Sequence, residues 1–150
     1  MSIDVLSALA LFALITSITP GPNNLMLMAS GANFGFARTV PHMLGITLGF
    51  MVMLLLVGFG LIRVFDAFPI IYTVLKLLSL IYLIYLAYKI ATAAPVQSAD
   101  PNAKPLSFLQ AAGFQWVNPK AWAFGLSVIT IYVPSAGILP LVITALVVAV

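Results

Sequence analysis

The 150-residue sequence is 63% hydrophobic and 6% charged, with a net charge of +3 and no cysteine. A soluble domain carries roughly a quarter of its residues as charged side chains, so this composition excludes a water-soluble domain and indicates a chain that lies in lipid. The lack of cysteine excludes disulfides and thiolate metal sites. One histidine (His42) and three carboxylates (Asp4, Asp66 and Asp100) leave little material for catalysis. We therefore expect no enzyme, cofactor, metal site or nucleic-acid partner.

Apolar runs predict an all-α bundle of several membrane-spanning helices, because about 20 apolar residues cross the hydrocarbon core. Four crossings and the start of a fifth follow from the runs Val5–Ala32, Val40–Ile62, Ala67–Tyr88, Leu106–Val133 and Ile138–Val150. The fifth run is too short to span at about 1.5 Å per residue, so we expect the chain to be a fragment truncated in its fifth helix.

A polar stretch divides the chain into two parts. We expect residues 1–94 to form a first three-helix repeat, 95–105 a cytoplasmic loop, and 106–150 an incomplete second repeat. The loops after the first and third helices carry three basic residues, Arg38, Lys89 and Lys104, whereas the loop after the second carries Arg63. Because lysine and arginine mark cytoplasmic loops, we expect the N-terminus outside.

The first predicted helix is interrupted by Thr19-Pro20-Gly21-Pro22. A proline inside a helix costs about 3 kcal/mol, and in lipid the freed carbonyls need protein or a wet cavity. A proline often only kinks a membrane helix, but two prolines around a glycine favour a true break. Pro22 suits the first position of a new helix. Asn23 and Asn24 then lie in its first turn, at the positive end of the dipole, which attracts a carboxylate.

The fourth predicted helix is interrupted in the same way by Asn118-Pro119-Lys120. A charge at the depth of Lys120 needs a partner or a water-filled cavity. Three crossings separate the two breaks, so the second repeat is expected to be inverted. Paired broken helices in inverted halves point to a transport site at the midplane. The predicted binding residues are Pro20, Gly21, Pro22, Asn23, Asn24, Asn118, Pro119 and Lys120. A substrate carboxylate is expected at the helix beginning at Pro22, and its amine at carbonyls around Ile18 and Trp116.

Three further features carry expectations. Gly45 and Gly49 form a GxxxG pair that lets another helix approach closely, either within the chain or in a homo-oligomer. We expect His42 to be a hydrogen-bonded residue near the membrane interface, with a proton relay as the alternative. We expect Asp66 to cap the third helix.

The motif Thr19-Pro20-Gly21-Pro22-Asn23-Asn24 resembles the first half of the LysE/RhtB family of bacterial amino-acid exporters. Val117-Asn118-Pro119-Lys120 is similar to the second-half motif of that family, and Ala103-Lys104-Pro105 with Ser107-Phe108 is similar to its cysteine/O-acetylserine branch. The resemblance implies a six-helix inner-membrane exporter of small amino acids, of the cysteine/O-acetylserine or homoserine/threonine type, coupled to the proton gradient. The alternatives are a non-transporting structural subunit and a truncated, inactive exporter.

Overall fold

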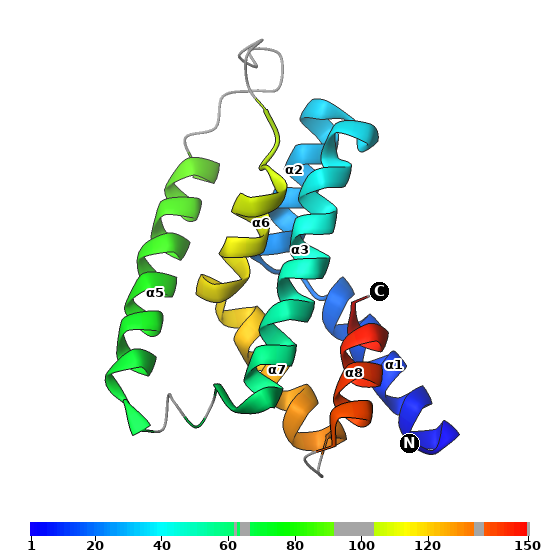
Figure 1. Ribbon diagram of the computed structural model, residues 1–150. Helices are drawn as coiled ribbons and strands as arrows, with labels where there is room; N and C mark the ends of the chain where they lie inside the picture. The colour runs from blue at the N-terminus through cyan, green and yellow to red at the C-terminus, as the bar shows by residue number, and fades with distance from the viewer. Residues whose placement is uncertain (62, 64–66, 92–103, 134–136, 150) are drawn as a thin grey trace.

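The computed structural model describes residues 1–61, 63, 67–91, 104–133 and 137–149, and every regular element in these ranges is helical (Figure 1). The elements in chain order are α1 (Ile3–Ile18), α2 (Pro22–Phe34), α3 (Phe36–Leu56), the π-helical turn η1 (Val57–Leu61), α5 (Ile70–Ala91), α6 (Phe108–Phe114), the 3₁₀ turn η3 (Gln115–Val117), α7 (Pro119–Tyr132) and α8 (Ile138–Val148). The predicted all-α fold class is confirmed.

The first predicted break separates α1 from α2, which are bent by 61° relative to each other. Gly21 is the N-cap of α2 and Pro22 lies in its first turn, as expected for a proline whose missing N–H would be unpaired there. Together the two helices are long and apolar enough to cross a membrane, either as a broken span or as a re-entrant loop. The expected break in the first predicted helix is therefore confirmed.

Helix α3 continues into η1, and the segment Phe36–Gly60 is 25 residues long and contains an 18-residue window with a mean hydropathy of 2.3. Among the residues described, this segment and the bent α1–α2 pair are long and apolar enough to cross a membrane. The helix begins four residues before the predicted Val40, because Gly35 alone (φ 77°) separates α3 from α2. At the other end Gly60 (φ 116°) ends the regular helix.

The GxxxG pair on α3 is in contact with α6 of the same chain. A Cβ built on Gly49 would lie 2.5 Å from Ala112 Cα, and one built on Gly45 would lie 2.7 Å from Ala111 Cβ. Only glycine permits this separation, since such distances are well inside van der Waals contact. The within-chain alternative for Gly45 and Gly49 is therefore what the structure shows.

The second predicted break is also present. Ser107 and Gln110 form a reciprocal capping box at the start of α6, which satisfies two backbone donors that a helix terminus leaves unpaired. The chain then tightens into η3 and restarts as α7, with Asn118 as N-cap and Pro119 in the first turn. Leu106–Val133 thus forms two half-helices, as predicted.

The core lies where α3 meets α1, α7 and α8, and its most buried members are Leu9, Met53, Leu54, Val128 and Ala145. Helix α5 packs on η3 and runs along one side of the molecule (Figure 1). The proposed cap Asp66 and residues 92–103, which include most of the predicted loop 95–105, lie outside the described residues. The inverted repeats over 1–94 and 106–150 stay a prediction.

Candidate functional site

The two breaks meet in space, and Lys120 joins them. Its Nζ donates a hydrogen bond to the carbonyl oxygen of Thr19, the C-cap residue of α1, whose carbonyl has no helical partner because the helix ends there. A Cβ on Gly21 would lie 2.6 Å from Lys120 Cδ, so the glycine makes room for the lysine stem. Lys120 therefore has a hydrogen-bond partner at the other break, as predicted for a charge within an apolar run.

A second link joins the same breaks through side-chain amides. Asn23 Nδ2 donates to Gln115 Oε1 at 2.9 Å, and Gln115 Nε2 donates to Asn23 Oδ1 at 3.3 Å. Gln115 is 0% exposed and also donates to the carbonyl of Ala111 at 3.0 Å. Sequence reasoning missed Gln115. The signal that could have found it was an amide inside an apolar run, a few residues before a helix-breaking proline.

Asn24 closes the end of α1. Its Nδ2 donates to the carbonyl oxygens of Ser17 at 2.8 Å, Thr19 at 3.0 Å and Ile18 at 3.5 Å. The side chain thus provides hydrogen bonds to carbonyls that the break would otherwise leave without a partner. Asn24 lies beside the predicted binding position, but its amide nitrogen is engaged by the backbone of α1.

The second break is closed by two local contacts. Asn118 Oδ1 accepts from the backbone N–H of Lys120 at 3.1 Å, which is an ordinary N-cap interaction. Trp122 Nε1 donates to the carbonyl of Trp116 at 2.8 Å. The carbonyl of Trp116, which we expected to meet a substrate amine, is therefore already hydrogen-bonded within the protein.

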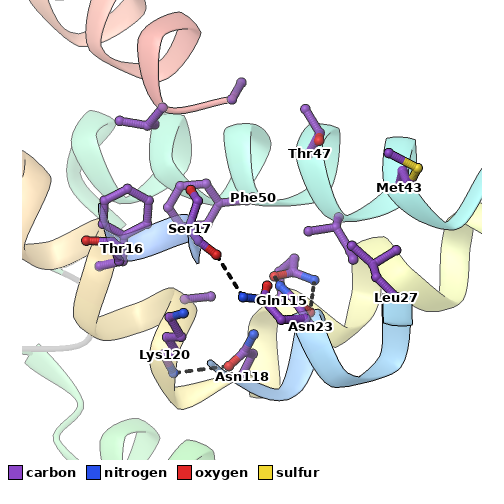
Figure 2. Close-up of a pocket in the computed structure, with 17 residues that line it drawn as sticks. Thr16, Ser17, Asn23, Leu27, Met43, Thr47, Phe50, Gln115, Asn118 and Lys120 are labelled. Carbon is purple, nitrogen blue, oxygen red and sulfur yellow. Dashed lines mark hydrogen bonds between the residues drawn. The ribbon is translucent and has the colours of Figure 1, made fainter. Parts of the chain in front are cut away.

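Between the breaks lies a cavity of about 260 Å³, slightly below the roughly 300–1,000 Å³ of common ligand pockets. Figure 2 shows Asn23, Gln115, Asn118 and Lys120 on one side of it, with α3 along the other. Helix α3 contributes Met43, Ile46, Thr47 and Phe50. The ring of Phe50 stacks on Phe124 with centroids 5.2 Å apart and planes 1° from parallel, which gives the cavity one flat aromatic wall.

Five of the predicted residues line this cavity: Gly21, Asn23, Asn24, Asn118 and Lys120. The other three, Pro20, Pro22 and Pro119, are not among the lining residues. These prolines lie in the two breaks. Pro22 and Pro119 each lie in the first turn of the helix that follows. The prolines therefore shape the site through the backbone.

Helix ends give the cavity two electrostatic poles. The N-cap residues of α2 and α7, Gly21 and Asn118, both line it, and helix N-termini carry a partial positive charge. The ammonium of Lys120 adds to this pole. Thr16 and Ser17 line the cavity from the C-terminal turn of α1, where the partial charge is negative. Such a site complements a small solute that carries both a carboxylate and an ammonium group.

His42 differs from expectation. The residue is 1% exposed, and neither ring nitrogen has a hydrogen-bond partner within the described part of the chain. The expectation of a hydrogen-bonded histidine was wrong, because this stretch of α3 meets α6 at Gly45 and Gly49, and on the α2 side the hydroxyls of Thr39 and Ser30 bond each other.

The sequence is similar to known proteins over most of its length. The profile of the LysE type translocator family matches residues 14–150. A cysteine/O-acetylserine efflux protein of Salmonella typhimurium strain LT2 is 37% identical over 134 residues, which cover 86% of this chain and 66% of the relative. The protein of the same name from Escherichia coli strain K12 is 34% identical over 136 residues, which cover 89% and 68%. The chain thus spans about two thirds of the length of these relatives. No solved structure matches it.

Proposed function

This chain belongs to the LysE type translocator family, and we propose that it exports small amino acids across the bacterial inner membrane as a secondary transporter. The observation that carries the proposal is the contact between Lys120 of one broken helix and Thr19 of the other, beside a cavity with a positive and a negative pole. Interrupted helices at a shared cavity are the usual way in which membrane transporters bind small charged solutes.

The substrate carboxylate is proposed to lie against the N-termini of α2 and α7. Backbone N–H groups there point along the helix axes and favour an anion. Lys120 Nζ supplies the full positive charge, and in this conformation it is held by the Thr19 carbonyl. An incoming carboxylate is a stronger partner for an ammonium than a neutral carbonyl, so it displaces that contact when it binds.

The substrate ammonium is proposed to lie at the C-terminal turn of α1. Thr16 and Ser17 line the cavity there, and the carbonyls of that turn are at the negative end of the helix. A carbonyl oxygen has two lone pairs, so the Ser17 carbonyl that accepts from Asn24 retains a site for a substrate N–H. The amine is proposed to lie on α1 in preference to Trp116, because Thr16 and Ser17 line the cavity whereas Trp116 is not among the lining residues.

The cavity volume favours a small side chain. At about 260 Å³, walled by Phe50 and Phe124, it suits cysteine and O-acetylserine, the solutes named for the relatives. Homoserine and threonine are of similar size and are the second candidates. As in the sequence-based prediction, we propose that the N-terminus is outside and that the loop 95–105 is cytoplasmic.

Binding to the purified chain in liposomes tests the proposal. Labelled cysteine, O-acetylserine, threonine and leucine are compared in a scintillation assay, followed by efflux from loaded vesicles. We expect binding of the small amino acids that is lost in Asn23→Ala and retained in Asn33→Ala. Asn33 lies on the same helix, and its side-chain amide donates a hydrogen bond to the carbonyl of Ala29. Neither residue lines the cavity. No binding by a correctly inserted chain would contradict the proposal and support one of the two alternatives, a non-transporting structural subunit or a truncated, inactive exporter.

A further inference from the structure

We propose that His42 is a proton-binding site whose occupancy is coupled to the separation of α6 from α3. The inference rests on the proposed export function and assigns that function a coupling group. It starts from one observation that the substrate site does not explain, which is a buried imidazole with both nitrogens unpartnered among the described residues.

The position of His42 follows from helical spacing on α3. Thr39, His42, Gly45 and Gly49 are three or four residues apart, so they form one stripe along the helix. Thr39 Oγ1 lies 3.0 Å from Ser30 Oγ of α2, and both glycines contact α6. His42 therefore sits between the contact with α2 and the contact with α6, where it is 1% exposed.

Few charged groups surround it. Of the elements packed against α3, the helices α2, α6 and α8 and the turns η1 and η3 contain no ionisable side chain. Helix α7 carries Lys120 and Tyr132, α3 itself carries Arg38, and Asp4 lies in the first turn of α1, at the end away from the break. Among the described residues, no carboxylate is therefore placed beside the imidazole as a counter-ion.

The two protonation states make different demands on this site. A neutral imidazole has one donor and one acceptor, whereas an imidazolium has two donors and a full charge. In the conformation described, a protonated ring would leave both donors unpaired in an apolar setting, which is strongly unfavourable. Protonation therefore favours a conformation in which the ring reaches water or an acceptor.

The contact that must open is the one between α3 and α6. Its two glycines allow α6 to lie directly on α3, so the ring gains access when α6 moves away. Helix α6 runs into η3, which carries Gln115, the partner of Asn23 at the cavity. The movement that admits a proton to His42 thus also disturbs the amide pair at the substrate site. Proton and substrate then influence each other reciprocally.

Cysteine accessibility tests the inference directly, because the chain has no cysteine of its own. Ala111→Cys places a thiol at the contact with Gly45, and Leu109→Cys places one on the same helix at a position that is 78% exposed. Maleimide labelling rates of the two variants are measured in lipid nanodiscs between about pH 7.5 and 5.5, where histidine ordinarily titrates. Their ratio removes the intrinsic pH dependence of thiol reactivity.

We expect the ratio of the Ala111→Cys rate to the Leu109→Cys rate to rise several-fold on acidification. The same ratio is expected to stay flat when His42→Gln is added, since glutamine keeps a donor and an acceptor but binds no proton in this range. A flat ratio with His42 present, or an equal rise in the His42→Gln background, would overturn the inference.

Binding of L-cysteine in the same nanodiscs separates the two proposals. A chain that opens in a His42-dependent way but does not bind supports the proton site and contradicts the proposed export function. A chain that binds L-cysteine without His42-dependent opening supports the export function and contradicts the proton site.

Discussion

The side-chain amides of Asn23 and Gln115 hydrogen-bond each other in both directions, at 2.9 and 3.3 Å, across 92 residues of sequence. Each amide offers one donor and one acceptor to the other, so this reciprocal pair holds the two broken helices together. The pair lies at the wall of the cavity, and its strength sets how readily the two breaks separate.

A double-mutant cycle measures that strength. Asn23→Ala and Gln115→Ala are each expected to lower the free energy of unfolding by about 1–3 kcal/mol, because the first leaves the buried Gln115 Oε1 without its partner and the second removes both bonds from the half-buried Asn23. The double variant is expected to lose less than the sum, with a coupling energy of about 1–2 kcal/mol. Unfolding in detergent is the measurement. The control is the same cycle on Asn33 and Gln110, which do not bond each other and whose losses are expected to add. Additive losses for Asn23 and Gln115 would show that the pair is not formed.

Gly21→Ala is expected to weaken amino-acid binding through Lys120. The backbone of Gly21 is extended (φ −167°) and accepts alanine without strain, so the effect is steric. The new Cβ would lie 2.6 Å from Lys120 Cδ and would push the ammonium away from Thr19. The control is Gly31→Ala on the same helix, where nothing lies within 4 Å. It is expected to stabilise the chain by roughly 0.5–1 kcal/mol. Equal effects of the two variants would contradict the steric explanation.

Lys120→Met is expected to raise the dissociation constant for the bound amino acid about 10- to 100-fold, since a charge-assisted hydrogen bond contributes roughly 1.5–3 kcal/mol. Methionine preserves most of the stem that packs on Gly21. Lys76→Met, at an exposed position on α5, removes the same charge away from the cavity and is expected to leave affinity unchanged. Equilibrium binding in liposomes distinguishes the two, and unaltered affinity in Lys120→Met would remove Lys120 from the site.

Gly49→Val is expected to destabilise the chain by about 1–3 kcal/mol, the usual cost of overpacking a tight contact. Its side chain would meet the backbone of Ala112, whose Cα would lie 2.5 Å from a Cβ at position 49. Gly113→Ala on the facing helix meets nothing within 4 Å and serves as the control. Thermal unfolding of both variants in one detergent is the measurement. A Gly49→Val variant as stable as the control would mean that α6 does not rest on this glycine.

The breaks were predictable because proline acts locally. Two prolines around Gly21, and a proline after Asn118, disrupt a helix wherever the rest of the chain lies. The need of Lys120 for a partner was predictable as well, but the identity of that partner was not. The Thr19 carbonyl is 101 positions away in sequence, and only the packing of α7 against α1 brings it within reach.

Other features depended on packing that one sequence does not reveal. Gln115 was overlooked because its role depends on a hydrogen bond to Asn23, which is 92 residues away in sequence. Asn24 lies in the expected turn, but the 61° bend places its amide against the end of α1. His42 was expected to follow the rule that buried polar groups are paired, and among the described residues it departs from that rule.

The indole contact at the second break has a practical consequence. Trp116 and Trp122 are the two tryptophans of the sequence, with ring centroids 6.1 Å apart and planes at 70°. Both flank the break, and the indole N–H of Trp122 is bonded to the carbonyl of Trp116. All tryptophan emission of these 150 residues therefore originates around the start of α7, within a few residues of Lys120. The unlabelled chain carries an intrinsic optical reporter, and solute binding or rearrangement at this break is observable as a change in fluorescence.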